Sequence, residues 1–167
     1  MTEPRRSRSS FPPGYGLPDT EEGLLGWAQV RQRLEESKHY WLTTVRPDGR
    51  PHVIPRWGVW LDDRFYYDGS PHTRHVRNLE AGNTNVTLNL EDGWRAVMLD
   101  GVSEATRADV DGLGARLAEA FTKYHDDNYA PAADAWSGED GGGLRVITPS
   151  TALAWFTFPT DATRFTF

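Results

Sequence analysis

Short segments of alternating apolar and polar residues, separated by tight-turn sequences, fill most of the chain from residue 39 onward. Pro47-Asp48-Gly49, Asp62-Asp63 and Glu91-Asp92-Gly93 are typical of turns between adjacent antiparallel strands. The alternation in residues 84–90 places the apolar side chains on one face of a strand. Because the strands come as consecutive hairpins rather than alternating with helices, the pattern argues against a parallel Rossmann sheet and predicts an antiparallel barrel.

The predicted strands cover about residues 39–46, 51–61, 64–67, 84–90, 94–105, 144–147 and 153–158, and the second of them is interrupted before it resumes at Gly58. Pro55 has no N–H to donate, so the second strand is expected to be interrupted or to lie at a sheet edge. Apolar residues at helical spacing predict helices over about 19–37 and 110–124. Residues 128–143, rich in alanine, aspartate and glycine, are expected to form a mobile loop that covers the ligand mouth.

The length of 167 residues indicates a single domain, expected over 19–167. Residues 1–18, rich in arginine, serine and proline, are predicted to be a disordered tail. A net charge of −6 argues against a nucleic-acid partner, and the absence of cysteine excludes disulfides and thiolate chemistry. No apolar run approaches the ~20 residues of a membrane span, so we expect a soluble, cytoplasmic protein.

The segment after the third strand indicates an anion-binding site. Ser70 is the expected N-cap of a short helix, with Pro71 as its first residue. The free N–H groups of such a first turn attract an anion such as a phosphate. Arg74, His75 and Arg77 add basic side chains within two turns.

Other chemistry is poorly supported. His72 and His75 share a helix face, but no third ligand at a recognisable spacing accompanies them, so no metal site is predicted. Asp62 and Asp63 are turn residues, and no strong nucleophile or acid–base pair is evident. An enzyme of this kind would leave the bond-making to a redox cofactor and supply position and electronic tuning.

A series of motifs occurs in a defined order: Tyr40-Trp41-Leu42, Thr44–His52, Pro55, Trp57–Trp60, Arg77-Asn78-Leu79 and Ala162–Phe167. Together they resemble the flavin and deazaflavin oxidoreductases of the pyridoxamine 5′-phosphate oxidase type, over roughly residues 25–167. The resemblance implies a mainly β fold, a six-stranded antiparallel split β-barrel with flanking helices. It also implies a homodimer that binds FMN or the deazaflavin coenzyme F-420 at the subunit interface.

The resemblance also implies which residues contact the cofactor. The expected contacts to the isoalloxazine or deazaflavin ring come from His52, Ile54, Pro55 and Arg56. The expected contacts to the phosphate come from Tyr67, Asp68, Thr73, Arg74 and His75. The closing strand, which in the family often completes the neighbouring subunit's site, is matched by Trp155 and Arg164.

Two positions depart from the family pattern. His75 stands where relatives usually carry a lysine, and histidine is mostly neutral at pH 7 unless a phosphate raises its pKa. Arg56 replaces a small apolar residue of the ring-contacting strand. We hypothesise that Arg56 compensates for the missing lysine; the alternative is that it fills the site and excludes the cofactor.

These features predict a flavin- or F-420-dependent oxidoreductase that transfers a hydride to a small, electron-poor acceptor. F-420 is slightly favoured. The excess of arginine over lysine suggests a GC-rich bacterial genome such as that of an actinobacterium, and F-420 is common in those bacteria. The alternative is a non-catalytic cofactor-binding or carrier protein of the same fold, since neither function requires a catalytic side chain. Oxidation of pyridoxamine phosphate itself is disfavoured, because Ala162-Thr163-Arg164 does not resemble that enzyme's usual ending.

Overall fold

A computed structural model describes residues 3–167, and its centre is a nine-stranded sheet in which every pairing is antiparallel. The main path runs through β1 (Arg5–Arg8), β9 (Thr163–Thr166), β8 (Arg145–Ala154), β7 (Val97–Ala105), β6 (Asn85–Leu90), β2 (Tyr40–Val45) and β3 (Pro51–Arg56). Beside this path, β4 (Val59–Leu61) pairs with β5 (Arg64–Tyr67), which pairs with β8. The predicted antiparallel split-barrel architecture is confirmed, but the sheet has nine strands rather than six and does not close.

The long strand β8 divides the sheet. Its first residues pair with β5, and its last residues, Thr151–Ala154, pair with β9, while β7 accompanies its whole length. The register of β7 and β8 shifts between Asp100 and Gly101. A Cβ at Gly101 would lie 2.4 Å from the Thr148 carbonyl oxygen, so only glycine permits the backbones to approach this closely.

Strand β3 forms one edge of the main path and pairs only with β2. An edge strand tolerates proline because an outward-facing N–H makes no ladder bond. This position explains Pro51 and Pro55 and confirms the edge expected from the sequence. The chain leaves β3 at Trp57 and Gly58 and enters β4.

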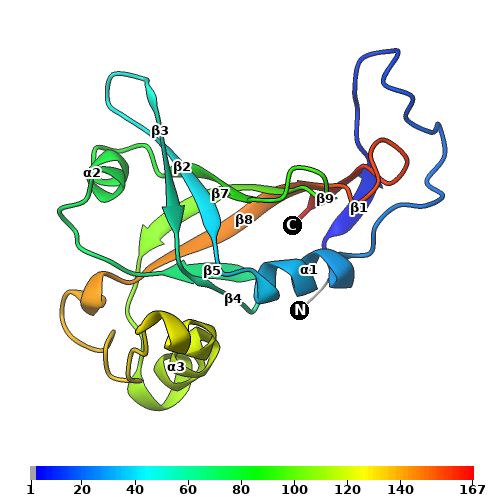
Figure 1. Ribbon diagram of the computed structural model, residues 1–167. Coiled ribbons are helices and arrows are strands. Elements are labelled where there is room, and N and C mark those ends of the chain that lie inside the picture. Colours follow the sequence, from blue (N-terminus) through cyan, green and yellow to red (C-terminus); the bar gives the residue numbers. More distant parts are fainter. Residues whose placement is uncertain (1–2) are drawn as a thin grey trace.

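The helices pack at separate places on the sheet (Figure 1). Helix α1 (Trp27–Glu36) buries Trp27, Val30 and Leu34, and the short α2 (Arg74–Glu80) lies beside β2 at one end. A helical unit below the sheet contains a π-helical turn η1 (Val110–Gly114), α3 (Ala115–Ala120) and the 3₁₀ segment η2 (Phe121–Asp127), and a further 3₁₀ turn, η3 (Gly141–Gly143), precedes β8. Within residues 3–167, no helix combines the length and apolar character needed to cross a membrane.

Two hydrophobic clusters follow from this packing. One fills the space between the sheet and α1 and contains Trp27, Tyr40 and Phe165 among other residues. The other joins β4 and β5 to the helical unit, and Tyr124 and Trp136 are both fully buried in it. Trp136 anchors the segment 128–143 in this cluster, although most other residues of the segment are exposed.

Several local expectations differ from the structure. The last two strands, expected over residues 144–147 and 153–158 with a break at Pro149, form the single strand β8, because the register shift against β7 accommodates Pro149 within the strand; β9 was not among the predicted strands. Residues 5–8, expected in a disordered tail, form β1 and pair with β9. The reason is that the free edge of β9 accepts backbone hydrogen bonds whatever the side chains of the added strand are. Met1 and Thr2 of that tail lie outside the described residues. The first helix begins at Trp27 rather than near residue 19. Helix α2 begins at Arg74 with Thr73 as its N-cap residue, so Ser70 and Pro71 belong to a preceding turn.

Candidate functional site

An open cavity of about 700 Å³ lies beside the edge strand β3. Its walls come from the residue before β2, the end of β3, the segment after β5, and the two ends of the segment 128–143. The lining residues are His39, Pro55, Arg56, Trp57, Asp68, Gly69, Tyr129 and Gly142. The volume lies within the range of small-molecule and cofactor sites.

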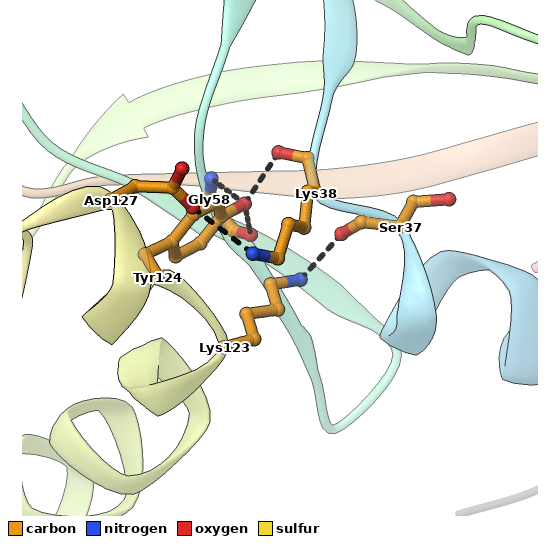
Figure 2. Close-up of polar contacts among 6 residues, drawn as sticks. All are labelled: Ser37, Lys38, Gly58, Lys123, Tyr124 and Asp127. Atoms are coloured by element: carbon orange, nitrogen blue, oxygen red, sulfur yellow. Dashed lines mark hydrogen bonds and ion pairs between the residues drawn. The ribbon is translucent and has the colours of Figure 1, made fainter.

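Tyr124 of the helical unit holds the strand ends that border the cavity (Figure 2). Its hydroxyl oxygen accepts a hydrogen bond from the Gly58 N–H at 3.0 Å and lies 2.7 Å from the Lys38 carbonyl and 2.8 Å from the Gly58 carbonyl. The Trp57 ring stacks on the Tyr124 ring, with centroids 5.1 Å apart. This arrangement fixes an aromatic side chain at the cavity wall, where it remains 37% exposed.

Lys123, the neighbour of Tyr124, ties the same unit to the end of α1 (Figure 2). Its Nζ donates to the Ser37 carbonyl at 2.7 Å and lies 3.0 Å from the Tyr40 hydroxyl. Burial lowers the pKa of Lys123 to about 8. Satisfied by carbonyl and hydroxyl oxygens, this lysine stabilises the helix terminus and takes no part in the cavity wall.

Arg56 is the arginine of the cavity wall. Its guanidinium donates from Nη2 to the Asp68 carbonyl and lies over the Tyr67 ring, 5.3 Å from the centroid. A Cβ at residue 69 would lie 2.9 Å from Nη2, so glycine at this position makes room for the guanidinium. Among residues 3–167, the buried Nε atom of Arg56 has no hydrogen-bond partner, which leaves donor capacity for a ligand.

The Asp68 carboxylate joins the segment 128–143 to the rest of the site. Its Oδ2 accepts hydrogen bonds from the Tyr129 hydroxyl at 2.5 Å and from Trp136 Nε1 at 2.8 Å. Burial raises the pKa of Tyr129, and the Asp68 carboxylate raises it further, so the phenol keeps its proton. Two hydrogen bonds therefore tie this side of the cavity wall to Asp68, and its tyrosine is neutral.

His75 is a buried, neutral imidazole. Its side chain is 2% exposed and its ring lies 5.9 Å from the Tyr67 ring. Burial lowers the pKa of His75 to about 4, and the charges of Arg56 and Arg145 and the nearby His52 act in the same direction. His75 is therefore uncharged at neutral pH, unlike the lysine that the resemblance places at this position.

The structure brings three of the expected cofactor residues, Pro55, Arg56 and Asp68, into the cavity wall. Tyr67 lies directly behind Arg56, and the half-buried His52 and Ile54 point from β3 in the same direction as Arg56. Thr73 and Arg74 lie at the start of α2, outside the cavity lining.

Trp155 and Arg164 also lie outside the cavity lining. Trp155 packs against Phe158, and the exposed Arg164 sits in β9 opposite Ser7 and Leu153. Their expected role in a neighbouring subunit's site stays a prediction.

Five lining residues were absent from the expected set: His39, Trp57, Gly69, Tyr129 and Gly142. The sequence could have indicated Trp57, because an aromatic residue beside the ring-contacting strand is suited to stacking. It could also have indicated Tyr129 and Gly142, because they belong to the segment 128–143, which was expected at the ligand mouth. His39 is an isolated histidine in the sequence, and only the packing of β2 against β3 places it at the cavity.

The lining fits a flat ring system that bears an anionic group. Trp57 and Tyr129 offer aromatic surface, and Arg56 offers a guanidinium with an Nε that no described residue accepts from. Among the described residues, no group of three or more histidine, aspartate or glutamate side chains is arranged to hold a metal ion.

Comparisons with known proteins agree with this architecture. The sequence profile of the family described as pyridoxamine 5′-phosphate oxidase matches residues 27–156. No curated protein matches the chain. Among solved structures, one described as an F420 reductase is 23% identical with a TM-score of 0.53, covering 73% of this chain and 94% of its own.

Two further structures show the same fold. A FAD-binding protein from Mesorhizobium loti is 18% identical with a TM-score of 0.58, covering 84% of this chain and 93% of its own. A heme-binding protein from Mycobacterium smegmatis is 20% identical with a TM-score of 0.59, covering 85% of this chain and 58% of its own. At these identities the likeness establishes the fold alone.

Proposed function

The chain belongs to the pyridoxamine 5′-phosphate oxidase family, and from that premise we propose that it is an oxidoreductase that binds a flavin or a deazaflavin in the cavity beside β3. FMN and coenzyme F-420 are the two candidate cofactors, with F-420 slightly favoured. The acceptor is a small, electron-poor molecule. The observation that carries the proposal is the cavity of about 700 Å³, whose wall unites Pro55, Arg56 and Asp68 with the stacked Trp57.

The chain's own residues have separable tasks in this proposal. Arg56 pairs with the anionic group of the cofactor through its free donors, because a charged hydrogen bond to a phosphate is among the stronger polar contacts. Trp57, held by Tyr124, supplies a face for the ring system. Tyr129, bonded to Asp68, closes the side of the cavity and limits the access of water.

When bound, a reduced flavin or deazaflavin supplies a hydride to the acceptor. The protein contributes the relative position of cofactor and acceptor and the exclusion of water, and no side chain needs to form a covalent bond. A carrier protein of the same fold would need the same residues, so turnover has to be measured separately. A steady-state assay with chemically reduced cofactor and a panel of enones and quinones makes this distinction.

We also propose that the functional unit is a homodimer. The outer face of β2, β3 and β7 exposes Trp41, Val53 and Val102, which are 40%, 52% and 37% exposed. Trp41 lies opposite Pro55 and Thr43 opposite Val53, so the apolar surface continues to the cavity rim. A second copy related by a twofold axis would cover this face. Sedimentation analysis of the wild type and of Val53→Asp tests it, and an unchanged monomer in both would refute it.

Heme is a second candidate ligand, favoured by one observation. His39 places an imidazole at the cavity beside Trp57 and Arg56, and histidine is the usual axial ligand of heme iron while arginine suits a propionate. Heme binding would give a Soret band that shifts in His39→Ala. Such a result would favour a binding or carrier function over hydride transfer.

The first test is a titration of the purified protein with FMN, F-420 and hemin, followed by tryptophan fluorescence. We expect saturable, micromolar binding of one flavin-type cofactor, with quenching that is mostly lost in Trp57→Phe. Trp94→Phe is the matched control, because Trp94 is 90% exposed on a hairpin and lies outside the cavity lining. If neither FMN nor F-420 binds, the oxidoreductase proposal is wrong.

A further inference from the structure

Arg145, the first residue of β8, is a buried cation without a carboxylate partner. It is 7% exposed, and its Nε and Nη2 donate to the Oγ and the carbonyl of Ser103, each at 3.3 Å. Among residues 3–167, no carboxylate oxygen lies within 4.0 Å of its guanidinium. Glu80 and Asp140 border the same hollow of about 100 Å³, but both are exposed and screened by solvent.

Packing alone does not account for a charge at this position. Burial of an unpaired cation costs free energy, whereas a neutral glutamine would donate to Ser103 without that cost. The hydrogen bonds to Ser103 therefore explain the conformation of the Arg145 side chain but not why this buried residue is charged.

Arg145 and Arg56 both lie next to Tyr67. Tyr67 pairs with Arg145 across β5 and β8, and its hydroxyl lies 3.0 Å from Ser103 Oγ. The Arg56 guanidinium lies over the ring of this same tyrosine. Both arginines lower the pKa of His75, whose ring contacts Tyr67 from α2.

The charged groups next to Tyr67 are cationic. Arg56 lies over its ring from β3, and Arg145 pairs with it from β8. Two imidazoles accompany them: the neutral His75 lies beside the Tyr67 ring, and the half-buried His52, on the same face of β3 as Arg56, acts on His75. Two of these groups keep unpartnered buried atoms, Arg56 Nε and His52 Nδ1. The carboxylate on this side, Asp68, is already bonded to Tyr129 and Trp136.

We propose that Arg145 is a positioning residue for the anionic group of the ligand, acting from beneath Tyr67 while Arg56 makes the direct contact. The inference rests on the proposed function and deepens it: the site selects a ring system that carries a phosphate over the same ring without one. Arg145 is hydrogen-bonded to Ser103, and Ser103 to Tyr67, so Arg145 helps to fix the ring on which Arg56 lies. The positive charge of Arg145 also raises the electrostatic potential at Arg56.

Paired titrations with FMN and with riboflavin, which lacks the phosphate, test the proposal. Arg145→Gln is expected to weaken FMN binding by about tenfold and to change riboflavin binding less than twofold. Arg145→Lys, which keeps the charge, should restore most of the FMN affinity. Arg116→Gln, which removes an exposed arginine paired with Asp62, is the control and should change neither affinity. Equal weakening of both ligands, or no weakening of either, would overturn the inference.

A second readout requires no flavin. NMR titration of the His75 imidazole should show a higher pKa in Arg145→Gln than in the wild type, and inorganic phosphate at millimolar concentration should shift the His75 resonances in the wild type only. If the wild type binds no flavin but shows this phosphate response, the proposed cofactor is wrong and the role of Arg145 stands. A phosphate response that is absent, or equal in both proteins, overturns the role of Arg145. Thermal unfolding of each variant establishes that the fold persists.

Discussion

Removal of the Tyr124 hydroxyl should destabilise the protein and loosen the cavity wall. In Tyr124→Phe the buried Gly58 N–H loses its acceptor, and the Lys38 and Gly58 carbonyls lose a donor. An unsatisfied buried donor costs about 1–3 kcal/mol and the net loss of a hydrogen bond about 0.5–1.5 kcal/mol. We therefore expect the free energy of unfolding to fall by about 2–3 kcal/mol. The phenylalanine ring fills the same space, so no cavity adds to this loss.

Equilibrium unfolding in urea measures this change, and the melting temperature should fall by roughly 5–10 °C for a chain of this size. Tyr15→Phe is the matched control: Tyr15 is 52% exposed, and its ring contacts Phe11 and Phe158 without the hydroxyl, so we expect a change below about 0.5 kcal/mol. A loss below about 0.5 kcal/mol in Tyr124→Phe would refute the reasoning, since it would mean that the Gly58 N–H finds another partner.

Three further outcomes follow from single contacts. Arg56→Met, which keeps the apolar stem but removes the guanidinium, should weaken FMN binding about 10- to 100-fold, measured by fluorescence titration, because a charged hydrogen bond is worth about 1.5–3 kcal/mol; unchanged affinity would contradict the compensation hypothesis. The pKa of His75 is lowered from 6.5 to about 4, so between these pH values the unfolded chain binds a proton that the folded protein does not. The contribution of His75 to stability is therefore complete above pH 6.5 and declines as the pH falls toward 4. Urea unfolding at several pH values should show a weaker decline in His75→Gln. Gly101→Ala should cost about 2 kcal/mol or more in urea unfolding because its Cβ meets the Thr148 carbonyl at 2.4 Å, whereas Gly93→Ala, with nothing within 4 Å, should cost little.

The fold could be predicted largely from local patterns. The turn Asp62-Asp63 illustrates the reason: both residues adopt positive φ, 53° and 56°, and they join β4 to β5 as a two-residue hairpin. Such turn residues and the period-two alternation act over a few residues, so they define strand direction and the buried face without knowledge of the tertiary structure. The same reasoning located Pro55 at a sheet edge, as the structure confirms.

Local patterns failed where pairing depended on a distant partner. Residues 5–8 form a strand only because β9, more than 150 residues away in sequence, offers a free edge. The start of α2 moved from Pro71 to Arg74 because Ser70 is bonded within a turn of its own, to the His72 N–H. The pairing of residues 5–8 is not encoded in a window of a few residues, whereas the start of α2 depends on which of two local patterns, a cap or a turn, Ser70 adopts.

The sequence by itself determined the antiparallel strand order along each hairpin, the family, and the presence of a basic segment after β5. Only the tertiary structure decided which of these side chains face a ligand. It buries His75 as a neutral imidazole beneath Tyr67, leaves Arg56 as the arginine of the cavity wall, and brings His39, Trp57 and Tyr129 to the same cavity. The physical reason is that charge state and exposure depend on what packs against a side chain, and these neighbours come from strands and helices far apart in the chain.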